Sequence, residues 1–243
     1  MALPRAPMVV FTHVPKTSGT SFRKALVEPN VPAAEIFPYR GLRPFLLSGG
    51  WRHDFVWGHM PSGVHLLTGR AVSYVTFLRD PVDRAVSYYY FVKDSDPAAY
   101  RHPDRDAADA LSLTEFFGQR RFQNWQARFV AGLPFHYAYP RLSSPRFERA
   151  LLRRATENLR DRYACFGMQE RFAESLDLIQ RRLGWERREE PGREKKTGRR
   201  PELADLDEVT VAALRRANSL DCELYAAAAE LFEAEVEGPG ARA

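Results

Sequence analysis

The chain has 243 residues, of which 44% are hydrophobic, and its formal net charge is +5. This length and apolar content are enough for one domain with a substantial core, so we expect a single domain over residues 1–243. The positive charge suits an anionic partner, but nucleic acid, a polyanionic sugar, a nucleotide and an acidic surface all fit it. Cys165 and Cys222 lie far apart and in no metal-ligand spacing, which argues against a disulfide scaffold and a zinc site.

Targeting and membrane signals are weak throughout the sequence. No stretch approaches the roughly 20 apolar residues that a membrane helix needs. The apolar run that starts at Met8 is too short for the core of a signal peptide. We therefore expect a soluble protein in the cytoplasm with no membrane span, while its oligomeric state stays open.

The first predicted elements are a strand, a polar loop and a helix. Residues 8–13 join β-branched and aromatic side chains and predict a buried strand. A Pro-Lys-Thr-Ser-Gly loop ends this strand, and residues 21–27 predict a helix. Loop N–H groups and the N-terminus of that helix face one point, which should hold an anion.

A second strand-to-helix junction follows further along the chain. Residues 54–57 and the near-continuous apolar run 73–78 predict two more strands, the latter of the kind buried in parallel sheets. Asp80 can cap the next helix with Pro81 in its first turn, so residues 82–92 should be helical.

The second half of the chain predicts helices with one late strand. The pattern indicates helices at 113–130, 146–159 and 171–183, a strand at 163–168, and a helix or helix pair at 205–232. Two segments predict loops: 94–109, which should be exposed, and 186–200, which is basic and rich in Pro and Gly and should be mobile. The fold expected from this order is α/β: a P-loop-like three-layer fold with a central parallel sheet flanked by helices.

The segment from His13 to Ser21 carries the strongest chemical signal. A P-loop kinase or NTPase has its lysine after the last glycine, whereas here Lys16 precedes Gly19. The loop can therefore bind a phosphate-like group through its lysine, hydroxyls and amides without a magnesium ion, although an ordinary polar loop would share its composition.

The Pro-Lys-Thr-Ser-Gly-Thr-Ser stretch resembles the 5'-phosphosulfate loop of the sulfotransferases that use 3'-phosphoadenosine 5'-phosphosulfate (PAPS), in the branch of heparan sulfate 2-O- and 6-O-sulfotransferases and their bacterial relatives. The resemblance implies that Lys16 contacts the phosphosulfate. It further implies that the residues after Lys16 cradle this group: Thr17, Ser18, Gly19, Thr20 and Ser21.

The segment from Phe77 to Tyr90 resembles the 3'-phosphate segment of the same family, which implies that Arg79 and Ser87 hold the 3'-phosphate. An isolated Arg-Asp-Pro would be an ordinary helix cap, but two such motifs at the ends of two strands are specific. The Trp57-Gly58-His59 segment resembles the one that carries the catalytic histidine, so His59 is the expected base. Without that resemblance, a lone histidine after a strand is more often structural.

Two further segments resemble parts of the family but leave alternatives open. Residues 124–132 either border the acceptor cleft or form an amphipathic helix with Arg128 in a structural ion pair. The basic run 193–200 resembles a loop that closes over the nucleotide, which would bring Lys195, Lys196 and Thr197 to the cofactor, but charge runs are most often only solvated.

The sequence therefore predicts transfer of a sulfuryl group from PAPS to an acceptor hydroxyl, on a carbohydrate or glycoconjugate, with His59 and Lys16 as catalytic residues. It predicts no metal requirement and no nucleic-acid partner. The alternatives are an atypical P-loop phosphotransferase and a non-enzymatic module that binds polyanions.

Overall fold

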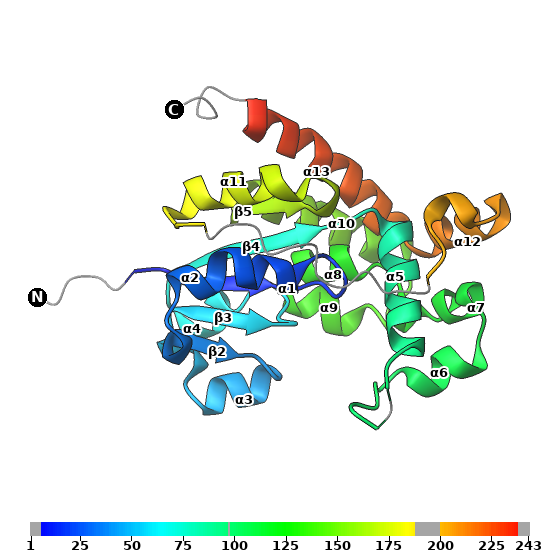
Figure 1. The fold of residues 1–243 in the computed structure, drawn as a ribbon, viewed down its shortest axis with the longest axis horizontal. Coiled ribbons are helices and arrows are strands. Elements are labelled where there is room, and N and C mark those ends of the chain that lie inside the picture. The colour runs from blue at the N-terminus through cyan, green and yellow to red at the C-terminus, as the bar shows by residue number, and fades with distance from the viewer. Residues whose placement is uncertain (1–5, 97, 188–199, 238–243) are drawn as a thin grey trace, which may run out of the picture.

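The computed structural model describes residues 6–96, 98–187 and 200–237. Its core is a five-stranded sheet in the order β2-β3-β1-β4-β5, in which every strand pair is parallel (Figure 1). The strands are β1 (Met8–Thr12), β2 (Ile36–Pro38), β3 (Phe55–Gly58), β4 (Val72–Leu78) and β5 (Tyr163–Met168). The expected α/β fold with a parallel sheet between helices is confirmed.

Thirteen α-helices lie in the described part of the chain, and most are short. The first helical stretch passes from α1 through a π-turn, Arg23–Val27, into α2. The helices are α1 (Gly19–Phe22), α2 (Glu28–Asn30), α3 (Leu42–Leu47), α4 (His65–Thr68), α5 (Pro81–Lys93), α6 (Arg105–Ala110), α7 (Leu113–Gly118), α8 (Trp125–Ala131), α9 (Leu133–Ala138), α10 (Pro145–Asp161), α11 (Phe172–Leu183), α12 (Glu208–Ala217) and α13 (Ser219–Glu237).

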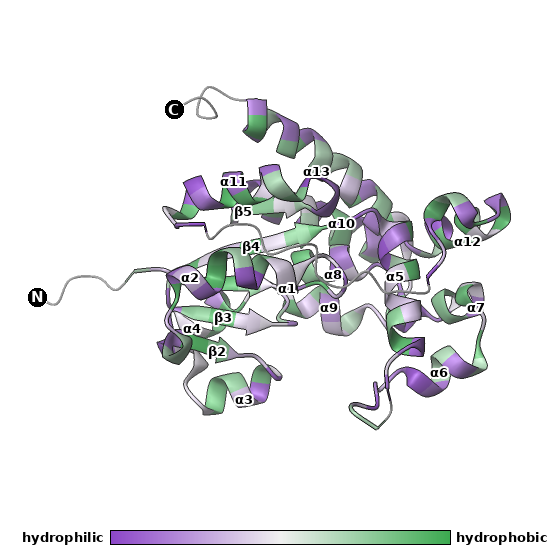
Figure 2. Cartoon of the chain, in the orientation of Figure 1, coloured by the Kyte–Doolittle hydropathy of each residue, from purple (hydrophilic) through white to green (hydrophobic). Residues whose placement is uncertain are grey.

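The sheet is buried on both faces because its apolar side chains alternate between two cores. Val10 and Leu78 join the core formed with α8, α10 and α13, whereas Phe11 and Phe77 join the core formed with α1, the π-turn and α11. Successive strand residues point to opposite faces, so both sets must be apolar. Figure 2 accordingly shows green strands beside helices that carry purple, hydrophilic residues.

A third core lies beyond the carboxyl ends of the strands, where α5, α6, α7 and α12 gather (Figure 1). Asp80 begins α5 as predicted, because its carboxylate accepts hydrogen bonds from the N–H groups of Val82 and Asp83. This cap directs α5 away from the sheet at the end of β4. The strand ends therefore lie between the sheet and a separate group of helices.

The predicted strands and most predicted helices are confirmed within a few residues, but two predictions were wrong. The helix expected over 113–130 is broken into α7, a 3₁₀ turn (Arg120–Phe122) and α8, because Asn124 adopts a left-handed backbone with φ 52°. The loop expected over 94–109 contains most of α6, since Arg105 and Asp109 form an i,i+4 ion pair there. Most of the predicted loop 186–200 lies outside the described residues.

Candidate active site at the carboxyl ends of β1, β3 and β4

The loop that follows β1 has an unusual backbone. Lys16 has φ 70° and Ser18 has φ 64°, left-handed conformations that cost roughly 1–3 kcal/mol each in residues other than glycine. Thr17 between them is buried and donates a hydrogen bond from Oγ1 to the carbonyl of Val14 over 2.8 Å. Left-handed residues at alternating positions turn N–H groups toward a common centre and form concave anion-binding sites. The loop geometry thus suits an anion.

Arg79 joins this loop to the end of β4. Its Nη1 donates to the carbonyl of Lys16 over 3.0 Å, and its Nε donates to Asp83 Oδ2 over 2.8 Å. Asp83 also pairs with Arg200. Burial opposes ionisation of Asp83, but the hydrogen bonds from Arg200 and Arg79 outweigh it and lower the pKa of this carboxyl. Arg79, Asp83 and Arg200 therefore form a chain with one net positive charge.

The orientation of Arg79 is fixed from α8. The backbone N–H of Arg79 donates to Gln126 Oε1 over 2.9 Å, and its carbonyl accepts from Gln126 Nε2 over 2.8 Å. Ser87 lies two turns into α5 and is only 2% exposed. Phe91 lies on the same helix as Ser87, and the Nζ atom of Lys16 is 4.2 Å from the centre of the Phe91 ring.

His59 follows β3 and stacks on His13, which follows β1. The two ring centres are 4.7 Å apart with an interplanar angle of 24°. His59 Nδ1 lies 2.7 Å from the carbonyl oxygen of His13, and because a carbonyl can only accept, Nδ1 carries the proton. The neutral ring therefore keeps Nε2 as a free base.

Both histidines are neutral at pH 7. Burial lowers the pKa of His13 to about 3, and the neighbouring His59 and Lys16 add to this effect. Burial also lowers the pKa of His59, although its hydrogen bond to His13 partly opposes the change. The His13 ring fills the space beside Gly19, where a Cβ atom would lie 2.2 Å from His13 Nε2. Of the two, His13 is a packed ring and His59 is the more accessible base.

The structure brings together most of the residues predicted to form the site. The segment from Lys16 to Ser21 follows β1, His59 follows β3, and Arg79 follows β4. These three strands are neighbours in the sheet, so the residues share its carboxyl edge. Ligands of open parallel sheets bind at this edge, where the strand order reverses. Lys195, Lys196 and Thr197 lie outside the described residues.

Residues 124–132 connect α8 to α9 and to the start of α13 through hydrogen bonds. Arg128 is buried and donates to the carbonyls of Arg121, Gln123 and His136. Its hydrogen-bond partners are therefore backbone groups and not the acidic side chain that one of the two alternatives would require. Asn124 Oδ1 accepts from the N–H groups of Leu220 and Asp221 at the start of α13. No sequence pattern marked these contacts or the role of Gln126. Asp83 was a recognisable ion-pair partner, because it lies in the first turn of α5, four residues after Arg79.

Comparison with known families identifies the chain. A family model described as galactose-3-O-sulfotransferase matches residues 59–243, which is most of the chain. The chain belongs to this galactose-3-O-sulfotransferase family. No curated protein matches it.

Membership in the galactose-3-O-sulfotransferase family makes the chain a carbohydrate sulfotransferase and confirms the expected sulfotransferase relationship. The heparan sulfate branch stays a resemblance. The matched region starts at His59 and contains Arg79 and Ser87, whereas the loop around Lys16 precedes it. Among the residues that the structure describes, no three His, Cys, Asp or Glu side chains are arranged to hold a metal ion, and no helix is long and apolar enough to cross a membrane.

Proposed function

We propose that this protein transfers a sulfuryl group from PAPS to a hydroxyl of a carbohydrate acceptor, with His59 as the base. The observation that carries the proposal is the shared edge of β1, β3 and β4, where a left-handed loop, a base and an arginine converge. Sulfuryl transfer needs an anion cradle and a base on opposite sides of the reacting sulfur. This edge carries a loop suited to an anion and a histidine suited to act as the base.

The charges and amides at this edge support PAPS as the donor. Lys16 and the amides of its loop would hold the 5'-phosphosulfate, and Arg79 with Ser87 would hold the 3'-phosphate. Asp83 neutralises only one of the two guanidinium groups it contacts, so a cationic surplus remains for the nucleotide. PAPS supplies an activated sulfuryl group with a phosphate leaving group.

The protein contributes positioning and proton transfer. His59 Nε2 takes the proton of the acceptor hydroxyl as the oxygen attacks sulfur, while the carbonyl of His13 stabilises the charge on the Nδ1 side. Lys16 stabilises the negative charge that develops on the bridging oxygen, an effect worth on the order of 10²–10³ in rate. The lowered pKa of His59 keeps it unprotonated, as a base must be, at neutral pH.

The acceptor proposal follows the family description. A galactose residue with a free 3-hydroxyl is the first acceptor to test, followed by other sugars. The direct experiment incubates the protein with PAPS and a panel of galactosides, other glycosides and polysaccharides, and detects an added sulfuryl group by mass. Lys16→Ala provides the inactive control. If no carbohydrate is sulfated while the protein binds PAP (3'-phosphoadenosine 5'-phosphate), the acceptor proposal fails and the donor proposal survives.

Nucleotide specificity separates the donor proposal from a phosphotransferase. PAP should raise the melting temperature without magnesium, because Lys16, Arg79 and the loop amides supply the positive charge themselves. At 100 times its dissociation constant, PAP should add about 2.7 kcal/mol to stability. Equal stabilisation by ADP, which lacks the 3'-phosphate, would contradict the roles of Arg79 and Ser87.

A further inference from the structure

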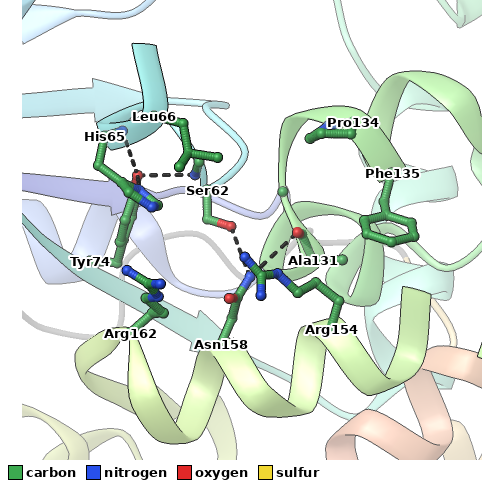
Figure 3. Close-up of a pocket in the computed structure, with 12 residues that line it drawn as sticks. Ser62, His65, Leu66, Tyr74, Ala131, Pro134, Phe135, Arg154, Asn158 and Arg162 are labelled. Carbon is green, nitrogen blue, oxygen red and sulfur yellow. Dashed lines mark hydrogen bonds between the residues drawn. The ribbon is translucent and has the colours of Figure 1, made fainter. Parts of the chain in front are cut away.

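A cavity of about 190 Å³ opens beside the segment that follows His59, between α4, the junction of α8 and α9, and α10 (Figure 3). None of Lys16, His59, Arg79 or Ser87 lines it, so it is separate from the proposed donor site. Its volume equals that of about six waters in the liquid and is below the roughly 300–1,000 Å³ of typical drug-sized sites. The cavity therefore suits a small group.

Hydrogen bonds at one wall fix the proton position on His65. Tyr74 Oη accepts from the N–H groups of Gly63 and His65 over 3.0 and 3.3 Å, which uses both of its lone pairs. The hydroxyl proton of Tyr74 then has His65 Nδ1 as its acceptor, at 2.9 Å. Since Nδ1 accepts, a neutral His65 must carry its own proton on Nε2.

His65 is held in this neutral form by its surroundings. Burial lowers its pKa, and Arg162 and Arg154 lower it further. Its Nε2 is buried and finds no hydrogen-bond partner among the described residues. A buried donor of this kind is costly unless an acceptor reaches it, and an oxygen atom of a bound ligand would be such an acceptor.

Two arginines add further donors. Arg154 of α10 and Arg162, the residue that follows this helix, extend toward the space in front of His65 and Asn158 (Figure 3). The guanidinium of Arg162 makes no ion pair or hydrogen bond with any residue in the described ranges, and the nearest carboxylate to Arg154 is Glu157, at 4.0 Å. Guanidinium groups bind carboxylate and sulfate oxygens in a bidentate manner.

The geometry points to a second oxyanion site in this cavity, which binds a carboxylate or sulfate group through His65 Nε2–H, Arg154 and Arg162. Because His65 Nδ1 is already occupied by Tyr74, the three side chains present only donors to a ligand, and a small oxyanion satisfies donors alone. The group could be a free anion or an acidic substituent of a sugar. The inference stands on these contacts and does not depend on the donor site.

The test uses the whole protein labelled with ¹⁵N-histidine, titrated at constant ionic strength with sodium sulfate, sodium glucuronate and uncharged glucose. We expect the resting spectrum to show His65 with its proton on Nε2, and this signal to move with sulfate, glucuronate or both but not with glucose. A response to sulfate alone identifies a free anion or sulfate ester, and a response to glucuronate identifies a sugar carboxylate. The His65 signal also separates this site from the loop at Lys16, where sulfate could bind as well.

The matched variants are Arg154→Gln/Arg162→Gln and, on the exposed side of the same helix, Arg149→Gln. The double variant should weaken the anion about tenfold or more, as expected for lost charge-assisted hydrogen bonds, while Arg149→Gln should bind as the unaltered protein does. A proton on Nδ1, no response to either anion, or unchanged affinity in the double variant would each overturn the site. PAP binding, measured in parallel, reports on the donor site separately.

Discussion

At the scale of single residues, the site depends on which nitrogen of His59 carries its proton. The carbonyl of His13 accepts from Nδ1, which leaves Nε2 as the basic nitrogen. The end of β1 determines the position of this carbonyl. Sequence alone could propose His59 from its resemblance. It could not predict the stacked His13 ring or the left-handed Lys16 and Ser18, because nothing in their residue types requires a positive φ.

Substitution of His59 should separate chemistry from binding. His59→Ala should reduce turnover by roughly 10²–10⁴-fold, the usual value of a positioned base, and leave PAP affinity nearly unchanged. Lys16→Ala should damage both, because Lys16 lies in the anion loop. Calorimetric titration with PAP and product formation from PAPS, at one salt concentration, measure the two effects. Near-normal turnover of His59→Ala would move the base elsewhere, with His13 the next residue to test.

At the scale of elements, a buried ion pair joins three helices. Asp221 of α13 accepts from the N–H groups of Gln126 and Ala127 at the start of α8, and lies 4.0 Å from Arg84 of α5. Both charged side chains are fully buried, and the guanidinium nitrogens of Arg84 make no hydrogen bond to the described parts of the chain. Arg84, Asp221 and the start of α8 are far apart in sequence. No local pattern therefore predicted the orientation of α8, whose Gln126 contacts the backbone of Arg79.

Loss of the negative charge at Asp221 should therefore be strongly destabilising. Asp221→Asn leaves the Arg84 charge buried without its counter-ion, and breaking such a pair typically costs about 3–5 kcal/mol. The check is the urea midpoint of unfolding, with Asp161→Asn as control because Asp161 pairs with Arg160 on the surface. An equal midpoint for the two variants would mean that Arg84 is not charged in the folded protein.

The junction of α8 and α9 requires glycine at position 132. Gly132 has φ 106°, and a Cβ atom there would lie 2.9 Å from the carbonyl oxygen of Ser62. Gly132→Ala should cost roughly 1–3 kcal/mol in stability through strain and crowding. Gly118→Ala is the matched control, since its added carbon would have no atom within 4 Å apart from its chain neighbours and the backbone of its own helix. Thermal unfolding of both variants decides the matter, and a neutral Gly132→Ala would show that the junction can shift.

At the scale of the whole molecule, the sequence predicted the sheet better than its surroundings. Four strands were recognisable because long apolar runs suit buried parallel strands. The edge strand β2 escaped because it has only three residues and ends in Pro38. The single helix predicted over 113–130 was wrong because Asn124 interrupts it. The left-handed conformation of Asn124 is stabilised by contacts with α13, nearly 100 residues later in the sequence.

Stability of the whole molecule should fall as the pH drops below 6.5. His13 and His136 both have pKa values lowered to about 3, chiefly by burial, so the unfolded chain binds more protons between pH 6.5 and 3. Each should cost roughly 1.4 kcal/mol by pH 5.5. Urea unfolding at pH 7.5, 6.5 and 5.5 measures the slope, and His136→Phe should remove the share that His136 contributes, roughly 1.4 kcal/mol between pH 7.5 and 5.5. An unchanged slope in that variant would assign the acid sensitivity to other groups.

The position of β1 also constrains how the protein is made. β1 lies in the middle of the sheet, but its partners β3 and β4 end at Gly58 and Leu78. A ribosome that adds about 5–20 residues per second needs roughly 3–13 s to extend the chain from Thr12 to Leu78. Until β3 and then β4 have been made, the apolar side chains of the nascent β1 are exposed and its backbone lacks the strands that flank it in the folded sheet. The contact between the Lys16 carbonyl and Arg79 can form only after β4 has been synthesised, so the part of the active site that is made first is one of the last to be completed.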